Sequence, residues 1–343
     1  MDCRAIDLLI KGYHREPLTK DECKYLLSFS EYSDESIFAY DLYTRFVKER
    51  CNNTAVLGVQ IGVFTGPCTG NCRFCNFGKD HTMSRPYVMP DDVLLNYLKE
   101  SFRFNDVPMI SLMTNHDCPI DTLVHYVKLT RSNSPKDVMI MINTGDRTYD
   151  ECIELRKAGA ELAYHVCRMG EGKDTDLDPE TRWQTLKNLK DAGFSTATCV
   201  EPIGQEHSVD DIIDNFFRGL DMGIDAGEIA LRMPVFGTPL GNMPTLTVRR
   251  YKQMMAVFGL ASSWYKGSDP LGFDIGYVNG LNRKSAEFAG SPRDIAFKSE
   301  LSAGHTLGWA RKLLFSMGYD KLLIPGGKKI SLDVDYLIET GSL

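Results

Sequence analysis

The chain has 343 residues, of which 43% are hydrophobic, and this is enough apolar material for one large folded domain with an extension. Its formal net charge of −7 argues against a protein that binds nucleic acid or anionic membranes by general charge attraction. Its 10 cysteines are far sparser than those of small disulfide-rich secreted proteins and favour a reducing compartment. We therefore expect a cytoplasmic protein without a nucleic-acid or membrane partner.

Residues 1–52 have the pattern of a helical extension. The apolar stretch at residues 5–10 is too short and too interrupted for a signal peptide or a membrane span. Thr19 and Glu22 match a capping box. Apolar residues then recur at helical spacing at Ile37, Tyr40, Tyr43, Phe46 and Val47. We expect this extension to pack on the following domain and to cover one end of it.

From residue 57 onward, short apolar runs alternate with helical patterns. The predicted strands are 57–64, 108–114, 138–143, 162–167, 195–201, 228–235 and 321–325, with a weak candidate at 272–277. Predicted helices between them include 89–102, 121–130 and 147–157, and glycines stand where helices end at Gly159, Gly193, Gly223 and Gly318.

This alternation with short joints is typical of parallel βα units. It predicts an α/β fold, a full or partial TIM-like (β/α) barrel over residues 53–325, with the helical extension before it and a C-terminal tail at 326–343. The stretch 265–302 has no clear pattern and fits a long lid or a broken βα unit.

Three cysteines follow the first predicted strand with the spacing C-x3-C-x2-C, namely Cys68, Cys72 and Cys75. Glycine, proline and asparagine in the surrounding loop let the backbone turn back on itself. Thiolates at this spacing suit an iron–sulfur cluster or zinc. A closed structural zinc site needs four ligands, and the loop 66–78 supplies no fourth Cys or His. Three ligands to a four-iron cluster leave one iron open for a substrate or cofactor.

The spacing, with Phe74 just before the third cysteine, resembles the signature of the radical S-adenosylmethionine (AdoMet) superfamily. The resemblance implies that Cys68, Cys72 and Cys75 bind a [4Fe–4S] cluster and that AdoMet occupies the open iron. The reduced cluster then cleaves AdoMet to methionine and a 5′-deoxyadenosyl radical, which abstracts hydrogen from a substrate C–H bond. The alternative is a small zinc site or an incidental group of cysteines.

Short segments between about residues 50 and 320 are similar to one branch of this superfamily, which contains biotin synthase, the [FeFe]-hydrogenase maturases and methylornithine synthase. Residues 237–240 match their Gly-Thr-Pro-Leu element, residues 203–206 occupy the place of their glycine-rich turn, and residues 301–304 resemble part of the last barrel strand of biotin synthase. The AdoMet-binding positions that this resemblance implies are Phe74, Thr114, Asn115, His165, Arg182 and Val200.

The chemistry of AdoMet gives most of these positions a role. Its carboxylate favours a bidentate cation, which suits Arg182. Thr114 and Asn115 can accept hydrogen bonds from its ammonium group, and His165 stands where relatives contact the ribose. Adenine can pair with backbone groups beside Phe74. The alternatives are a surface salt bridge for Arg182 and a buried, hydrogen-bonded ring for His165.

Two charged residues stand on otherwise apolar predicted strands, Glu201 and Arg232. A charge on such a strand is unfavourable unless it is paired. We expect the two either to pair with each other or to bind a polar small-molecule substrate at the barrel mouth.

Three further cysteines, Cys118, Cys167 and Cys199, lie at or near the carboxyl ends of predicted strands. Biotin synthase holds a second cluster within its barrel, so the resemblance raises an auxiliary cluster on these three thiols as one alternative. Buried cysteine commonly acts as a small hydrophobic residue, which is the other alternative.

Two reactions remain open at this level. One is sulfur insertion of the biotin or lipoyl type, which needs a sacrificial second cluster. The other is carbon-skeleton cleavage or rearrangement in amino-acid or cofactor biosynthesis, which needs only one. Both imply a low-potential electron donor, flavodoxin or ferredoxin. A non-catalytic cluster or zinc protein is a third, more distant class.

Overall fold

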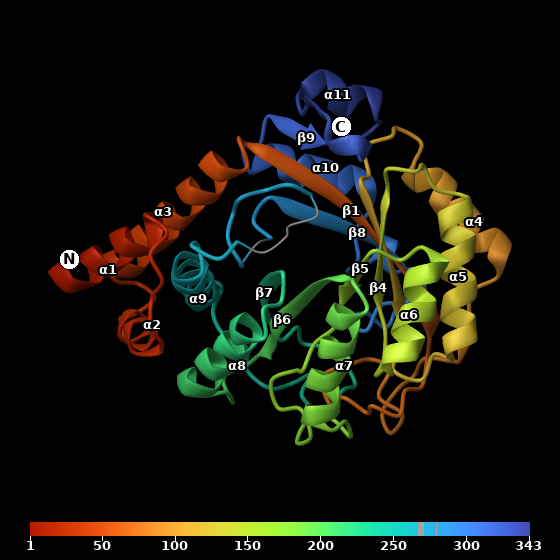
Figure 1. The fold of residues 1–343 in the computed structure, drawn as a ribbon, viewed down its shortest axis with the longest axis horizontal. Helices are drawn as coiled ribbons and strands as arrows, with labels where there is room; N and C mark the ends of the chain where they lie inside the picture. Colours follow the sequence, from red (N-terminus) through yellow and green to blue (C-terminus); the bar gives the residue numbers. More distant parts are fainter. Residues whose placement is uncertain (267–270, 279) are drawn as a thin grey trace.

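The computed structural model describes residues 1–266, 271–278 and 280–343. Its centre is a curled, mainly parallel sheet whose outer face is covered by helices (Figure 1). The strands are β1 (Thr54–Thr65), β2 (Tyr87–Val88), β3 (Met109–Thr114), β4 (Met139–Asn143), β5 (Leu162–Tyr164), β6 (Ser195–Ile203), β7 (Ala226–Leu231), β8 (Arg283–Ala289), β9 (Lys321–Leu323) and β10 (Lys329–Ser331). The helices are α1 (Cys3–Tyr13), α2 (Lys20–Leu27), α3 (Asp34–Arg50), α4 (Asp91–Ser101), α5 (Ile120–Ser132), α6 (Tyr149–Ala158), α7 (Pro179–Asp191), α8 (Val209–Asp221), α9 (Val248–Ala261), α10 (Leu307–Ser316) and α11 (Val334–Glu339).

The sheet forms a partial TIM-like barrel, which confirms the predicted fold class. Its strand order is β10-β9-β1-β3-β4-β5-β6-β7, and β8 and β2 also pair with β1. The neighbours from β1 through β7 on this path run parallel, as do β1 and β8. The carboxyl ends of these strands therefore gather at one mouth, where parallel α/β folds place their chemistry.

The alternation of strands and helices depends on the local sequence signals that predicted it. Gly159, Gly193, Gly223 and Gly318 all have positive φ, between 68° and 113°, at or just after the end of a helix. Glycine adopts this conformation without steric cost, so each position stops a helix and redirects the chain into a strand. Thr19 and Glu22 make the predicted capping box at the start of α2.

The strand β8 lies inside the stretch that gave no clear pattern. It pairs with β1 from Val56↔Arg283 to Gly62↔Ala289. The weak strand candidate at 272–277 is wrong, because the structure gives those residues no strand conformation, and Val278 beside them makes only an isolated bridge to Gly227. Residues 301–304, expected in a barrel strand, instead end a 3-10 turn (Ser299–Leu301) and continue as a turn.

The N-terminal helices pack against the flank of the barrel rather than over one end of it. Both α1 and α3 contact α9, and α2 contacts α8 and α9 (Figure 1). The buried Tyr43 of α3 donates its hydroxyl hydrogen to the backbone oxygen of Val278 at 2.9 Å. Gly259 of α9 permits this packing, since a Cβ there would lie 2.2 Å from the Tyr43 ring. The extension thus holds the segment that lies beside β7.

The C-terminal segment folds back beside β1. Strand β9 pairs with the start of β1, and β10 pairs antiparallel with β9. Arg311 of α10 donates a hydrogen bond of 2.8 Å to the buried Asp106, which also accepts one from Tyr336 of α11. Among the described helices, none combines the length and the apolar character that a bilayer crossing requires.

Candidate active site at the barrel mouth

The cysteine loop follows β1 directly and is closed on itself by backbone hydrogen bonds. The backbone N–H of Cys68 donates to the oxygen of Phe77 at 2.7 Å, and that of Lys79 donates to the oxygen of Cys68 at 3.1 Å. Gly66, with φ 116°, opens the loop, and a Cβ there would lie 2.7 Å from the backbone of Arg85 and Pro86. Only glycine fits this close approach.

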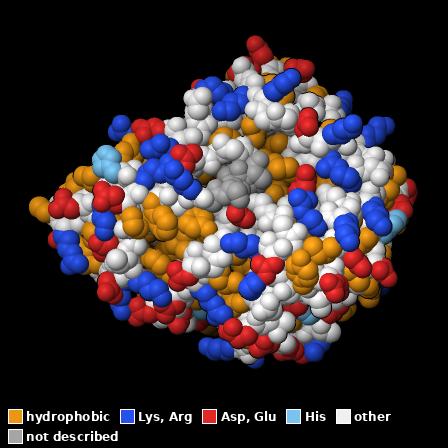
Figure 2. All heavy atoms as spheres, in the orientation of Figure 1, with side chains coloured by type: hydrophobic (Ala, Val, Ile, Leu, Met, Phe, Trp, Pro, Cys, Tyr) orange, Lys and Arg blue, Asp and Glu red, His pale blue; other side chains and the backbone are white. Residues whose placement is uncertain are grey.

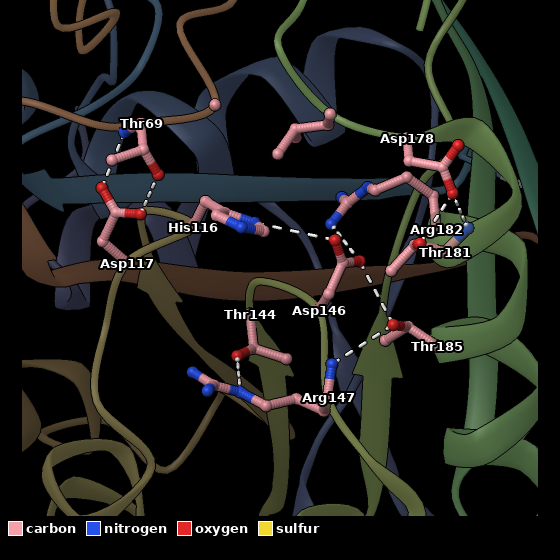
Figure 3. A network of polar contacts seen from close by, with 12 residues as sticks. Thr69, His116, Asp117, Thr144, Asp146, Arg147, Asp178, Thr181, Arg182 and Thr185 are labelled. Atoms are coloured by element: carbon pink, nitrogen blue, oxygen red, sulfur yellow. Dashed lines mark hydrogen bonds and ion pairs between the residues drawn. The ribbon is translucent and has the colours of Figure 1, made fainter. Parts of the chain in front are cut away.

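Loops from several other strand ends hold the cysteine loop in place. After β3, Asp117 accepts from the N–H of Thr69 at 2.7 Å and from its hydroxyl group (Figure 3). Backbone bonds join Arg73 to the loops after β5 and β7, and Asn76 to the loop after β8. The loops at the carboxyl ends of the strands therefore hold the three thiols in position.

The three thiols face a shared space. Cys68, Cys72 and Cys75 line a cavity of about 90 Å³, and Cys72 and Cys75 also line an adjoining cavity of about 280 Å³ inside the barrel. Among the described residues, no three His, Cys, Asp or Glu side chains stand at the separation that one metal ion requires. A four-iron cluster is wider than a single ion, so three thiols around one cavity fit the cluster as a donor set.

Burial shapes the protonation of these thiols. It raises the pKa of Cys68 and Cys75, and it raises the pKa of Cys72 to about 11, against the opposing charge of Arg168. The thiols are therefore protonated at neutral pH until a metal displaces their protons, because metal ligation requires the thiolate.

Two of the predicted AdoMet residues line the smaller cavity but already have partners. Asn115 donates from Nδ2 to the backbone oxygens of Gly66 and Pro67, both at 3.3 Å, and its Oδ1 accepts from the N–H of Asp117. Thr114 donates its hydroxyl hydrogen to the oxygen of Asn143 at 3.1 Å. Asn115 therefore holds the start of the cysteine loop in place, independently of any contact with a ligand.

Arg182 reaches the same cavity from α7. Its Nε and Nη2 donate to the backbone oxygen of Val166, and its Nη1 donates to Oδ1 of Asp146 at 2.9 Å. The guanidinium is buried and lies 3.6 Å from the carboxylate of Glu171. The surface salt bridge considered for Arg182 is thus wrong, because the side chains of Arg182 and of its partner Asp146 (Figure 3) are only 4% and 17% exposed.

Asp146 is the centre of a buried polar network. Burial alone would raise its carboxyl pKa, but His165, Arg182 and His116 outweigh burial and lower it. His165 lies 3.4 Å from Asp146 through Nε2, and its Nδ1 lies 3.2 Å from the backbone oxygen of Thr144. Burial and the charge of Arg182 lower the pKa of His165 to about 3, so this ring is neutral at pH 7.

The structure corrects the expectations for His165 and Val200. Within the described part of the chain, neither residue lines either cavity. Side chains alternate between the two faces of a strand, so Ala197 and Glu201 of β6 face the barrel interior whereas Val200 packs into the hydrophobic core. His165 is the buried, hydrogen-bonded ring of the alternative interpretation. Phe74, by contrast, does line the barrel cavity beside Cys72 and Cys75.

Glu201 lines the barrel cavity, and β6 carries a bulge beside it. Four residues of β6, from Val200 to Ile203, oppose three of β7, from Ile229 to Leu231. Such a bulge re-aims the side chains beside it. The predicted pairing of Glu201 with Arg232 is wrong, since Arg232 pairs with Glu206.

Arg232 is fully engaged at the rim of the cavity. Its Nε and Nη2 donate to the two carboxylate oxygens of Glu206 at 3.0 and 3.2 Å. Its remaining N–H groups donate to the backbone oxygens of Leu240, Met243 and Pro244. The guanidinium of Arg232 fixes the loop after β7 in this way. Its N–H groups already have acceptors and are not available to a substrate.

The charged residues of the barrel cavity that had not been identified from the sequence are Arg168, Glu228, Arg283 and Arg293. Arg168, after β5, lines both cavities, and Glu228 of β7 lines the larger one. Burial opposes the charge of Arg168, but Cys72, Glu171 and Glu201 together raise its pKa above the ordinary value. Glu228 alternates with Ala226 and Ala230 on an apolar strand, which is the signal that singled out Glu201.

The cysteines considered for an auxiliary cluster point in different directions. Cys167 has its sulfur 3.7 Å from the backbone oxygen of Pro179 at α7, and Cys118 packs in the hydrophobic core before α5. Cys199 lies inside the barrel wall, where burial and the carboxylates Glu201 and Glu228 raise its pKa. None of the three lines either cavity in the residues that the structure describes.

Comparisons with known proteins support an enzymatic barrel. No family model matches the chain. The biotin synthase of Acetivibrio thermocellus is 25% identical over 244 residues, which cover 68% of this chain and 74% of that protein. The biotin synthase of Sulfurihydrogenibium sp. is 25% identical over 263 residues, with 71% and 75% covered. That of Aquifex aeolicus is 23% identical over 274 residues, with 74% and 79% covered.

Solved structures agree on the fold. Methylornithine synthase superposes with a TM-score of 0.67 at 16% identity over 74% of this chain and 76% of that one. The FeFe-hydrogenase maturase HydG from Carboxydothermus hydrogenoformans superposes with a TM-score of 0.73 at 14% identity over 92% and 78%. Together with the cysteine loop at the barrel mouth, these relationships indicate an enzyme that is similar to the biotin synthase branch of the radical S-adenosylmethionine superfamily.

Proposed function

We propose that this enzyme binds a [4Fe–4S] cluster through Cys68, Cys72 and Cys75 and AdoMet beside it, and that it acts on a small molecule held in the barrel. When bound, the reduced cluster and AdoMet supply a 5′-deoxyadenosyl radical that abstracts hydrogen from the substrate. The observation that carries the proposal is the shared cavity of the three thiols, which opens beside the larger cavity of the barrel.

The chain's own residues exclude water and position the reactants. The smaller cavity is lined by hydrogen-bonding groups of Asn115, His116 and Arg182, which suit the polar methionyl end of AdoMet. Arg168 separates the two cavities and supplies a cation at their boundary. The proximity of the cavities lets a radical formed in one reach a C–H bond in the other without crossing solvent.

Of the two reactions left open, carbon-skeleton cleavage or rearrangement with a single cluster has the better support. The candidate auxiliary cysteines Cys118, Cys167 and Cys199 line neither cavity of the described chain, and the barrel interior carries charged side chains instead. Sulfur insertion remains the second candidate, favoured by the similarity to biotin synthases. A low-potential flavodoxin or ferredoxin would supply the electron in either case.

The test of the first step is AdoMet cleavage by anaerobically reconstituted protein reduced with dithionite. Cys72→Ala should abolish 5′-deoxyadenosine formation while circular dichroism shows an intact fold. Cys152→Ala is the matched control, because Cys152 is a buried thiol of α6 outside both cavities. Undiminished 5′-deoxyadenosine formation by Cys72→Ala would refute the cluster assignment.

Counting iron and sulfide separates the two reactions. A single-cluster enzyme should hold about four irons per chain, whereas an auxiliary cluster raises the count to about six to eight. We expect about four, and we expect the count to be unchanged in Cys167→Ala and Cys199→Ala. A lower count in those two variants would favour sulfur insertion.

A further inference from the structure

We infer that the substrate of the barrel cavity carries a protonated amino group, which is held between the carboxylates of Glu201 and Glu228. This inference rests on the proposed function and names the chemical class of its substrate. It follows from the charges that line the cavity, from the partners that these charges already have, and from the strand register that brings the two carboxylates together.

The charged side chains that line the described cavity wall are Arg168, Glu201, Glu228, Arg232, Arg283 and Arg293. Three of the arginines are already engaged. Arg232 donates all its N–H groups to Glu206 and to backbone oxygens. Arg293 makes an ion pair with Glu287, and Arg283 has a partner of its own.

The other three charged side chains make no close ion pair with the described part of the chain. Across residues 1–266, 271–278 and 280–343, the side chains of Arg168, Glu201 and Glu228 make no ion pair within 4.0 Å. Two carboxylates without an ion-pair partner among the described residues therefore face the cavity, beside the guanidinium groups of Arg168 and Arg283. Arg168 also lines the cavity of the thiols.

The strand register brings the two carboxylates to one region of the wall. Cys199 of β6 is paired with Glu228 of β7, and Glu201 is the next residue of β6 that faces inward. Glu228 lies deep in the barrel, yet its side chain is exposed to the internal space of the cavity. Burial raises the pKa of Glu228, the charge of Arg283 opposes this effect, and the nearby charge of Glu201 adds to it.

Two neighbouring carboxylates in one cavity repel each other, and a cation between them relieves this repulsion. A protonated amine has three N–H donors and one positive charge, so it satisfies both groups at once. The rest of the wall suits a small molecule with an aliphatic part: the side chains of Met109, Met113 and Met141 are apolar, and those of Gln60, Ser111, Asn143 and Ser285 are short or neutral polar groups. The cavity volume of about 280 Å³ restricts the substrate to a small one.

The experiment measures binding of simple probes to the holoenzyme, loaded with cluster and AdoMet, by ligand-observed NMR under anaerobic conditions. The probes are 1,5-diaminopentane, L-lysine, hexanamide and hexanoate, which have a similar chain length and differ in charge. We expect the two amine probes to bind and hexanoate not to bind. Glu228→Gln should weaken amine binding by about tenfold or more, as the loss of one charge-assisted hydrogen bond implies.

Glu201→Gln, at the cavity mouth, provides a second variant in case Glu228→Gln fails to fold. Glu154→Gln is the matched control, because it removes one carboxylate from an exposed position on α6 and should leave amine binding unchanged. The inference is overturned if hexanamide or hexanoate binds better than the amines, or if both cavity variants bind amines like the wild type. AdoMet cleavage without added probe is measured in parallel. Its absence would refute the proposed function, whereas its presence with no preference for amines would refute only the substrate class.

Discussion

Asp146 accepts a hydrogen bond of 2.9 Å from Arg182, and this pair links the loop after β4 to helix α7 (Figure 3). The side chain of Arg182 is only 4% exposed and that of Asp146 17% exposed, so little solvent screens the pair. Thr185 of α7 also donates to Asp146 at 3.2 Å. The guanidinium that faces the smaller cavity is therefore fixed in position by the fold before any ligand binds.

Asp146→Asn should destabilise the protein substantially. The change keeps the shape of the side chain but removes the carboxylate in contact with Nη1 of Arg182, and it leaves the buried guanidinium with the more distant carboxylate of Glu171, at 3.6 Å. Breaking a buried pair from one side costs about 3–5 kcal/mol, and the partial exposure of Asp146 places this variant at about 3 kcal/mol. The free energy of unfolding in guanidinium chloride measures the effect.

Glu180→Gln is the control for that measurement. Glu180 pairs with Arg218 at 2.8 Å, but the two side chains are 74% and 43% exposed. Exposed ion pairs contribute about 0–1 kcal/mol, so this variant should be close to the wild type. Equal losses in the two variants would show that Asp146 does not hold a buried charge.

The stability of the protein should fall as pH decreases from 6.5 towards 3. In the unfolded chain His165 takes up a proton near pH 6.5, whereas in the folded protein burial and Arg182 lower its pKa to about 3. The unfolded state thus binds more protons than the folded state across this interval, and the stability decreases as the pH is lowered. Asp146, whose pKa is lowered below 3.8, adds a second loss at still lower pH.

His165→Gln should flatten this dependence between pH 6 and pH 4, because glutamine takes up no proton in either state. The slope of unfolding free energy against pH is the readout, since the absolute stability also reflects the changed packing. His125→Gln is the control, because the His125 side chain is 53% exposed on α5. An unchanged slope in His165→Gln would mean that the ring is protonated in the folded protein.

The fold could be predicted where local signals were strong. Glycines such as Gly159 and Gly193 require positive φ at helix ends, and apolar runs such as β1 are buried on both faces, so both features stand out in the sequence. Strand β8 was not predicted because its inward residues, among them Arg283 and Ser285, line a polar cavity instead of the apolar core. A strand beside an active site loses the hydrophobic pattern by which strands are recognised.

The same contrast holds for the site. Cys68, Cys72 and Cys75 form a local pattern and were found from their spacing. The buried network of Asp146 and the charge of Arg168 depend on loops that meet only in the folded chain, so no local pattern marks them. Val200 was assigned from the family resemblance, but strand periodicity places its side chain on the face opposite to that of Glu201.

Asp117→Ala should weaken retention of the cluster more than it weakens the fold. Asp117 holds the cysteine loop through the backbone and hydroxyl of Thr69, and it touches neither cavity in the described residues. Loss of such an outer contact typically lowers metal affinity about tenfold or more, whereas the stability cost of an exposed hydrogen bond is about 1 kcal/mol. Iron content after anaerobic gel filtration and the melting temperature measure the two effects separately.

Asp121→Ala is the control, because Asp121 lies nearby in the first turn of α5 and makes no side-chain hydrogen bond to the described residues. If both variants retain iron like the wild type, the contact between Asp117 and Thr69 is not needed to hold the cysteine loop. If Asp117→Ala instead unfolds, Thr69→Val tests the hydroxyl contact alone while leaving the backbone contact in place.

Tyr43→Phe should destabilise the junction between the N-terminal extension and the barrel. The hydroxyl of Tyr43 is fully buried and donates to the backbone oxygen of Val278 at 2.9 Å. Without it, that buried oxygen loses its donor while the aromatic packing is kept. The expected loss is about 1–2 kcal/mol of unfolding free energy, measured in urea on protein of equal iron content.

Tyr13→Phe separates this effect from the general loss of a tyrosine hydroxyl. Tyr13 donates to Glu49 at 2.6 Å at an exposed position, so its replacement should change stability by less than about 0.5 kcal/mol. Hydrogen exchange of the backbone amide of Gly227, which donates to the oxygen of Tyr277 at 2.8 Å, gives a local readout. Faster exchange there in Tyr43→Phe alone would show that α3 holds the segment beside β7, because an extension that merely adhered to the barrel surface would leave this amide protected.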